Sequence, residues 1–147
     1  MIAERTLILI KPDGVQRGMI GHVFTRLEMK GFKLCALKLV SLDRKQAEEF
    51  YSAHRGKYFF DRSVKHISSG PMVASVWEGI DIIHHARMLI GSAEDAAPGT
   101  IRADWALDVT RNVVHGSDSP DAARREIAMF FTESEILGYS RDIDRWI

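Results

Sequence analysis

The sequence has little of what marks a secreted, membrane-spanning or nucleic-acid-binding protein. Cys35 is the one cysteine among 147 residues, so no disulfide can form within the chain and a cysteine-rich zinc site is excluded. Twenty basic residues balance twenty acidic ones, and this zero net charge argues against the basic surface that sequence-independent DNA binding needs. We therefore expect no specific nucleic-acid partner.

Long hydrophobic runs are also absent. No apolar stretch approaches the ~20 residues that a membrane span needs. The apolar stretch after Glu4 and Arg5 is too short and too early for a secretory signal. Cys35 lies in an apolar run and is predicted to be a small buried core residue. These features favour a cytoplasmic protein without membrane association.

Two familiar nucleotide-handling patterns are missing as well. The phosphate-loop pattern GxxxxGK[ST] does not occur, nor does the motif set of protein kinases. His22, His54 and His66 lack the spacing of metal ligands, and the adjacent residues His84 and His85 point to different sides of a helix. We expect no metal site built by protein side chains, and any chemistry on nucleoside triphosphates must use another route.

The composition and the even distribution of structural signals predict one domain over residues 1–147. Hydrophobic residues make up 46% of the chain, and there is no repeat, low-complexity tract or linker. Short apolar runs predict strands at residues 6–10, 32–42, 71–77 and 113–115. Helical spacing and cap signals predict helices at residues 20–27, from 43, 58–67, 82–89 and from 119. Residues 11–14 are expected to form a turn and residues 92–111 irregular structure. This order predicts an α/β or α+β fold with helices covering a small sheet, without fixing the strand order.

The segment VVHGSDSPD is the best candidate for chemistry. His115 ends a predicted strand, Gly116 allows close backbone approach, and a helix begins after Ser117 and its neighbours. A helix N-terminus binds anions, and a histidine beside it can attack a phosphate. Glu126 lies on the helix face that leans back toward this loop and could set the tautomer of His115. The alternative is that His115 merely ends a strand and Glu126 faces solvent.

Three basic residues could meet a phosphate. Lys11 follows the first predicted strand, before a rigid turn. Arg87 lies in an otherwise apolar helix and Arg102 in GTIRAD, and each could clamp phosphate with its planar fork. Taken singly, such a lysine is more often a solvated loop residue, and such arginines more often form surface ion pairs. Tyr51 and Phe59 could stack on a base or simply pack in the core.

Taken together, these motifs resemble those of the nucleoside diphosphate kinase family. The matching segments are LILIKPDGVQRGMIG, SGPMVASVWEG, PGTIRADWA and RNVVHGSDSPDAARREIAMFF, in family order over nearly the whole chain. The resemblance implies a ferredoxin-like βαββαβ core with a four-stranded antiparallel sheet covered by helices. It also implies a ping-pong cycle, in which a nucleoside triphosphate held with Mg²⁺ phosphorylates a histidine, and a nucleoside diphosphate then takes the phosphate. A homo-oligomer is expected, with dimer, tetramer and hexamer all open.

The resemblance assigns the catalytic roles to five residues. His115 matches the phosphorylated histidine, and Glu126 and Ser117 match residues that support and orient it. Lys11 matches the lysine near the γ-phosphate and the ribose 3′-hydroxyl. Tyr51 matches the tyrosine beside the histidine.

Nucleotide binding falls to Lys11 and five further residues. Arg87 and Arg102 match the phosphate-binding arginines, and Asn112 matches the asparagine that contacts the ribose. Phe59 matches the aromatic residue that stacks on the base, and Val109 the apolar residue on its other side. No metal ligand is assigned, because Mg²⁺ is expected to be held mainly by the nucleotide phosphates. Stacking tolerates any base, so broad base and sugar tolerance is expected.

One loop departs from the family pattern. Residues 91–98 read GSAEDAAP, which is shorter than the family's usual loop and lacks its phosphate-contacting threonine, with Ser92 as a possible substitute. We expect altered nucleotide affinity rather than lost activity. This departure keeps open a catalytically weak relative that serves as a nucleotide-binding or scaffold protein. A phosphohistidine carrier or protein-histidine kinase is a further alternative.

Overall fold

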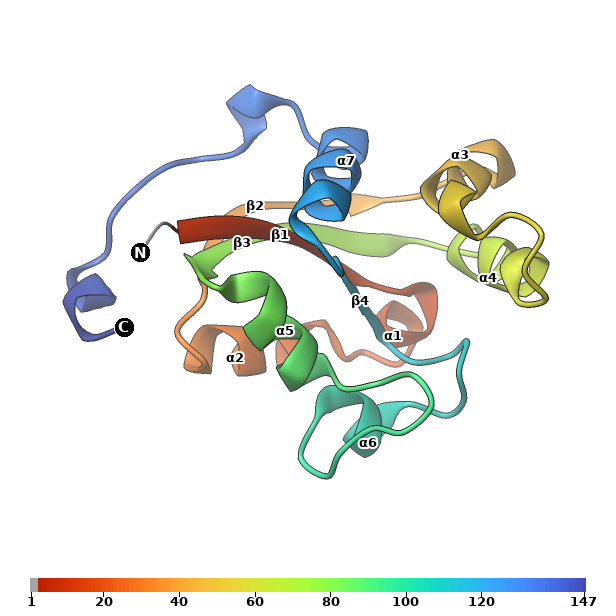
Figure 1. The fold of residues 1–147 in the computed structure, drawn as a ribbon, viewed down its shortest axis with the longest axis horizontal. Coiled ribbons are helices and arrows are strands. Elements are labelled where there is room, and N and C mark those ends of the chain that lie inside the picture. The colour runs from red at the N-terminus through yellow and green to blue at the C-terminus, as the bar shows by residue number, and fades with distance from the viewer. Residues whose placement is uncertain (1–2) are drawn as a thin grey trace.

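A four-stranded antiparallel sheet forms the centre of the computed structural model, which describes residues 3–147 (Figure 1). Its strands are β1 (Ala3–Ile10), β2 (Lys33–Val40), β3 (Met72–Ile80) and β4 (Val114–Gly116), in the order β2-β3-β1-β4. Every neighbouring pair is antiparallel, and the helical connections from β1 to β2 and from β3 to β4 each cross over a neighbouring strand. This is the ferredoxin-like βαββαβ arrangement, so the expected α+β class is confirmed.

Helices cover both faces of the sheet. Helix α7 (Pro120–Phe130) packs on one face with α3 (Arg44–Phe50) and α4 (Phe60–Ile67). Helices α2 (Ile20–Met29), α5 (Ile82–Ile90) and α6 (Ile101–Trp105) lie on the other face. The short helix α1 (Pro12–Gln16) follows β1 directly. Within the described part of the chain, three short 3₁₀ helices complete the regular structure, at Ser52–His54, Glu133–Glu135 and Asp142–Trp146.

Strand β1 divides the core into two halves. Its side chains alternate, so Leu7 and Leu9 pack against α3, α4 and α7, while Ile8 and Ile10 pack against α2 and α5. All four side chains are fully buried. A strand buried on both faces reads as a continuous apolar run, which is why TLILI stood out in the sequence. Cys35 is buried in the first of these halves, as predicted.

Two predicted irregular segments are helical, and those predictions were wrong. Pro12 and Asp13 open helix α1 rather than a simple turn, because proline at the first position and an acid in the first turn are both helix-start signals. Residues 92–111 contain α6, where the Thr100 hydroxyl accepts from the Ala103 amide at 3.2 Å and caps the helix. Helix α6 has 5 residues, too few to show periodicity.

Several predicted boundaries also moved. Strand β3 continues to Ile80 because residues 78–80 pair with residues 3–5 of β1. Strand β2 is shorter than predicted, and β4 begins at Val114 and includes Gly116. The capping box at Asp43 is confirmed, since its side chain accepts from Gln46 N at 2.8 Å. Within residues 3–147, the helices lack the length and apolar character that crossing a bilayer requires.

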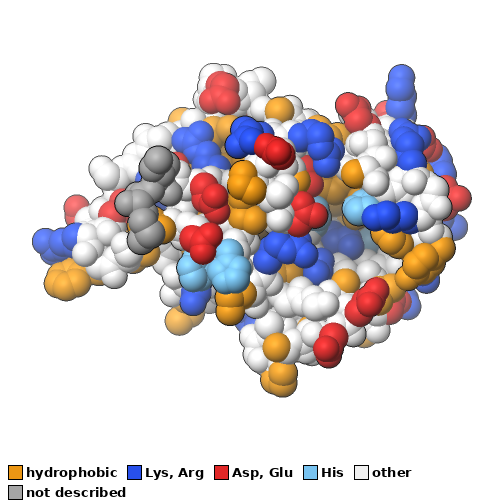
Figure 2. All heavy atoms as spheres, viewed as in Figure 1, with side chains coloured by type: hydrophobic (Ala, Val, Ile, Leu, Met, Phe, Trp, Pro, Cys, Tyr) orange, Lys and Arg blue, Asp and Glu red, His pale blue; other side chains and the backbone are white. Residues whose placement is uncertain are grey.

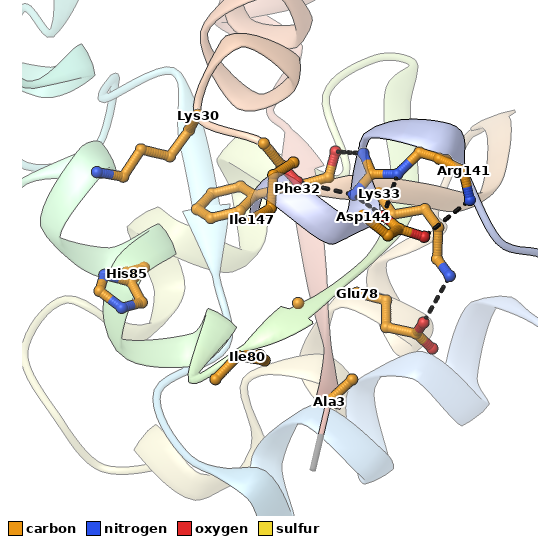
Figure 3. A pocket seen from close by; sticks show the side chains of 12 residues that line it. Ala3, Lys30, Phe32, Lys33, Glu78, Ile80, His85, Arg141, Asp144 and Ile147 are labelled. Atoms are coloured by element: carbon orange, nitrogen blue, oxygen red, sulfur yellow. Dashed lines mark hydrogen bonds and ion pairs between the residues drawn. The ribbon is translucent and has the colours of Figure 1, made fainter. Parts of the chain in front are cut away.

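The C-terminal segment packs against the start of β2, beside a cavity of about 530 Å³ (Figure 3). Arg141 donates to the carbonyls of Gly31 at 3.0 Å and Phe32 at 3.1 Å, and pairs with Asp144 at 2.9 Å. Lys33 pairs with Glu78 at 2.9 Å on the same wall. The cavity is lined by none of the predicted site residues.

Candidate active site

His115 lies on β4 and is held by a buried carboxylate. Its Nε2 lies 2.9 Å from Glu126 Oε1 on α7, and Ser117 Oγ donates to the same oxygen at 2.8 Å. Glu126 is 5% exposed and Ser117 is fully buried, so the alternative of a solvent-facing Glu126 is wrong. Burial alone would raise the pKa of Glu126, but the hydrogen bonds from His115 and Ser117 hold it below its usual range.

This hydrogen bond sets the histidine tautomer. An ionised carboxylate only accepts, so Nε2 carries the proton in the neutral imidazole, and Nδ1 is then the nitrogen with the lone pair. The His115 ring also meets the edge of Phe50, with ring centroids 5.0 Å apart, and Phe50 in turn contacts Tyr51 at the same separation. The imidazole is therefore fixed on two sides, with one basic nitrogen available.

The chain enters β4 through a strained turn. Val113 has φ of 74°, and Val114 N donates to Asn112 O at 2.8 Å across it. A hydrogen bond between residues two apart, with a left-handed central residue, defines a strained γ-turn. A β-branched residue rarely adopts this conformation. Backbone strain of this kind concentrates at functional sites, and here it lies two residues before His115.

Lys11 is buried in the same region, so the alternative of a solvated loop lysine is wrong. Its Nζ donates to Thr110 O at 3.0 Å and to Asn112 Oδ1 at 2.8 Å, which leaves the third N–H of the ammonium group for another acceptor. Burial, and then the charge of Arg102, lower the pKa of Lys11 to about 8 against the opposing charges of Asp13 and Asp108. A buried cation repelled by a second cation favours an anion nearby.

Arg87 and Arg102 donate hydrogen bonds to backbone carbonyls near His115 instead of forming the surface ion pairs considered above. Arg87 donates to Gly116 O at 3.0 Å, and Arg102 donates to Gly91 O at 3.0 Å and to Val114 O at 2.7 Å. Burial, and then the charge of Arg87, lower the pKa of Arg102 to about 10. Arg102 Nε is buried without a hydrogen-bond partner within residues 3–147. Figure 2 shows Lys and Arg side chains gathered around a hollow between α5 and the α3–α4 pair.

The remaining predicted residues flank this centre. Burial raises the pKa of Tyr51, and the charges of Arg102 and Glu126 act on it from nearby in opposite directions. Phe59 is half-buried before α4, with its ring 5.4 Å from that of His54. Val109 is 42% exposed, and its carbonyl accepts from Asn112 Nδ2 at 2.9 Å. The contacts thus join Val109 to Asn112 and Phe59 to the α3–α4 connection.

Sequence reasoning missed three residues that the structure draws into the site. His54 lies beside Tyr51 and Phe59, and its Nδ1 accepts from Lys57 Nζ at 3.0 Å. Burial, and then the charge of Lys57, lower the pKa of His54. Asp13 and His66 form a buried pair under the Val113 turn. The position of Asp13 directly after Lys11-Pro12 was a usable signal, whereas the histidines had no spacing that pointed here.

Ser92, the residue considered in place of the missing loop threonine, has a local role. Its Oγ accepts from Glu94 N at 3.3 Å and from Asp95 N at 3.4 Å, which closes a small turn. Ser92 also lines a hollow together with Arg87, Gly91 and Asp118.

Comparison with known proteins gives the family to which the chain belongs. The family model described as "Nucleoside diphosphate kinase" matches residues 4–136. The chain belongs to the nucleoside diphosphate kinase family. It is 52% identical over 146 residues to the nucleoside diphosphate kinase of Carboxydothermus hydrogenoformans, covering 98% of each chain. It is 49% identical to nucleoside diphosphate kinase 3 of Mus musculus, covering 99% of this chain and 88% of that protein.

A solved structure supports both the family and the fold. The halophilic nucleoside diphosphate kinase of Halobacterium salinarum, described in complex with CDP, superimposes with a TM-score of 0.94 at 48% identity. The match covers 99% of this chain and 98% of that one. The chain is thus a phosphotransferase of this family with the family's fold, and these comparisons do not favour the alternative of a weak nucleotide-binding or scaffold relative.

Proposed function

We propose that this chain moves the γ-phosphate of a nucleoside triphosphate to a nucleoside diphosphate by way of His115. The observation that carries the proposal is the His115–Glu126 pair, which places the proton of the neutral imidazole on Nε2 and makes Nδ1 its basic nitrogen, beside a group of buried or hydrogen-bonded cations. An imidazole in this state is a nucleophile, and the cations offset the charge of the transferring phosphate. Residues 1–147 are proposed to act as one catalytic domain.

The first half-reaction follows from this geometry. The lone pair of His115 Nδ1 forms a bond to the γ-phosphorus, and the bond from that phosphorus to the bridging oxygen breaks. The electron pair stays on the diphosphate, which leaves. The phosphorylated imidazole becomes cationic, and the ionised Glu126 opposite Nε2 stabilises that charge. A second nucleoside diphosphate then attacks the phosphorus and regenerates His115.

Substrate placement is proposed for the flanking residues. Lys11, Arg87 and Arg102 have N–H groups left over for phosphate oxygens, and Asn112 lies between Lys11 and the Val109 carbonyl, suited to a ribose. Tyr51 contacts Phe50, whose ring in turn meets that of His115, and Ser117 helps to hold Glu126. Phe59 and Val109 present apolar surface to the base and no group that reads its edge, so the base is proposed to vary widely.

A divalent cation fits this site only together with its nucleotide. Nucleotide kinases generally use such a cation, and we propose that Mg²⁺ is the one used here. The groups at the centre are mostly cationic, and within residues 3–147 no cluster of three His, Cys, Asp or Glu side chains could hold a metal ion. Mg²⁺ usually keeps several waters and binds substrate phosphates, where it would neutralise phosphate charge.

Assembly and location complete the proposal. We propose a homo-oligomer, because large apolar side chains remain exposed on the edge strand β2 and near the C-terminus, among them Leu39 and Trp146. Dimer, tetramer and hexamer remain alternatives. A cytoplasmic location stays a prediction.

The experiment that tests the proposal is brief incubation with γ-radiolabelled ATP and Mg²⁺, beside a His115→Ala variant. Acid-labile, base-stable label on the wild type alone, discharged by GDP and by CDP at comparable rates to give labelled triphosphates, is the expected result. Folded protein that binds nucleotide but takes up no label would refute the phosphohistidine route. A hundredfold preference among acceptor bases would refute broad base tolerance alone.

A further inference from the structure

A second histidine–carboxylate pair lies under the strand that carries His115. His66, in the last turn of α4, donates from Nε2 to Asp13 Oδ1 of α1 at 3.0 Å. Both side chains are largely buried, with 14% of His66 and 9% of Asp13 exposed. The two residues are far apart in the chain and come from helices on either side of β2 in sequence.

The other oxygen of Asp13 holds the strained turn. Asp13 Oδ2 accepts from Val113 N at 3.0 Å, and on the other side of the residue Val113 O accepts from Lys11 N at 2.8 Å. Val113 is thereby held at both of its peptide groups in a conformation, with φ of 74°, that a free valine would leave. Such strain persists only where the surroundings over-determine it.

The turn fixes the two predicted site residues on either side of it. Asn112, whose side chain accepts from Lys11, precedes Val113, and Val114–His115 follow it in β4. If Val113 relaxed to a negative φ, the peptide planes on both sides would rotate, and the spacing between Asn112 and His115 would change. Phosphoryl transfer depends steeply on in-line placement, so small displacements here reduce the rate.

His66 keeps Asp13 directed at the turn. A buried carboxylate that loses one of its donors is poorly solvated, so it turns toward water or toward the nearby Lys11 charge. Either movement withdraws Oδ2 from Val113 N. Without this hydrogen bond, the turn loses one of the contacts that hold Val113 in its strained conformation.

We propose that His66, acting through Asp13, is a positioning residue for the phosphotransfer reaction. The proposal rests on the function proposed above. His66 touches the carboxylate and not the reacting atoms, and its effect reaches His115 through the Val113 turn. Asp13 and His66 thus hold the backbone before His115 in place, just as Glu126 and Ser117 hold its ring.

The test compares variants at position 66 that differ in reach. His66→Gln places an amide N–H close to the position of Nε2, whereas His66→Asn places it about one bond short and His66→Phe keeps only the ring. We expect His66→Phe and His66→Asn to slow phosphorylation of His115 about 10- to 100-fold in single turnover, with nucleotide KM within about threefold of wild type. His66→Gln should recover the rate to within about threefold.

A second readout follows the turn itself. Hydrogen exchange at the Val113 amide should speed up at least about tenfold in His66→Phe and His66→Asn and stay near wild type in His66→Gln. His85→Phe, on the exposed side of α5, is the matched control and should change neither readout. If His66→Phe does not fold, the comparison of Asn with Gln carries the test.

Two results would overturn the proposal. One is a folded His66→Phe or His66→Asn variant that phosphorylates His115 at the wild-type rate, and the other is a Gln variant no faster than the Asn variant. Wild-type protein that takes up no phosphate would overturn the proposed function as well. The two failures are therefore distinguishable by the wild-type measurement.

Discussion

At the scale of single residues, the environment of each ionisable group assigns it a different task. Glu126 is buried but stays ionised because two donors face it, so it can orient and later stabilise an imidazole. Lys11 is buried with a second cation nearby, so its proton is held loosely until an anion arrives. Burial therefore opposes the charged form of both groups: the donors that face Glu126 overcome this effect, whereas the charge of Arg102 adds to it at Lys11.

Glu126→Ala should slow the reaction without weakening substrate binding. The change removes the acceptor that sets the His115 tautomer, and we expect kcat to fall about 100-fold or more while nucleotide KM stays within a fewfold. Glu126→Gln keeps an acceptor but no charge and should lie between this variant and wild type. Steady-state kinetics with ATP and a saturating diphosphate measure both. Glu133→Ala, an exposed residue just after α7, is the control and should behave as wild type.

Lys11 should give the reaction an alkaline limit. Its pKa of about 8 in the folded protein, below the 10.5 of a free lysine, means that the nucleotide-free enzyme loses this positive charge as the pH rises through 8. We expect kcat/KM for ATP to fall up to tenfold per pH unit above about pH 8. In Lys11→Gln, kcat/KM should be low and flat over the same range. A wild-type profile that is flat to about pH 9.5 would show that Lys11 is not needed as a cation.

The lowered pKa of Lys11 also makes the stability of the protein depend on pH, in the opposite direction to phosphate binding. Between pH about 8 and 10.5 the unfolded chain holds a proton on Lys11 that the folded protein has released. Stability of the nucleotide-free protein attributable to Lys11 therefore rises with pH across this window, while binding of phosphate weakens.

At the scale of elements, short helices matter here because they place single groups. Helix α1 turns the chain after β1 so that Lys11 and Asp13 face the start of β4. Helix α6 holds Arg102 beside Val114, and its own position is fixed by α2, where Arg26 pairs with Asp104 and lies 4.3 Å over the Trp105 ring. Neither helix is long enough to be stable alone, so both depend on these contacts.

Gly14→Ala should disturb the contact between α1 and the Val113 turn. A Cβ at this position would lie 2.8 Å from Ile10 Cγ2 and 3.1 Å from both Val113 O and Val113 Cγ1. Because backbone on the Val113 side cannot move without relaxing the turn, we expect a loss of about 1–3 kcal/mol in stability and slower His115 phosphorylation. Urea unfolding and single-turnover labelling measure the two effects.

The matched control for that substitution lies on α2. A Cβ at Gly21 meets no atom within 4 Å, so Gly21→Ala should stabilise the helix by about 0.5–1 kcal/mol and leave the reaction unchanged. Equal effects of the two alanine substitutions would contradict a specific role for the close approach at Gly14.

At the scale of the whole molecule, the site forms where the two halves of the core meet. Glu126 comes from the α7 side of the sheet, Arg87 and Arg102 from the α5–α6 side, and His115 from the short strand β4 between them. The hollow in Figure 2 is therefore bounded by elements from both layers. Large displacements of one layer against the other would separate His115, the proposed nucleophile, from the arginines proposed to bind phosphate.

The exposed apolar surface should make the protein associate. Leu37 and Leu39 on the edge strand β2 are 52% and 66% exposed, and Trp146 near the C-terminus is 77% exposed. We expect sedimentation equilibrium to give a mass that is a multiple of the 16.6 kDa chain at micromolar concentration. Replacing Leu37 and Leu39 together with lysine should shift the equilibrium toward the monomer. A wild-type protein that sediments as a monomer would refute the proposed oligomer.

The sequence by itself determined the chemistry and the fold class. Local signals are the continuous apolar run at residues 6–10, the cap at Asp43 and the Ser-Pro-Asp start of α7. Each depends only on neighbouring residues, so each could be predicted from the sequence. The segment around His115 combines a histidine with the start of a helix, and so it was predicted as the reactive segment without any tertiary information.

Only the tertiary structure decided which side chains share an environment. That Lys11 is buried, that Asp13 reaches Val113 and that His66 reaches Asp13 are contacts between residues about 50 to 100 positions apart, to which no local periodicity refers. The left-handed turn at Val113 likewise could not be predicted from the sequence, because a β-branched residue disfavours a positive φ. Residue type and spacing report what a segment prefers, whereas burial and strain arise from the packing of distant segments, and these set the charge states and the geometry of the site.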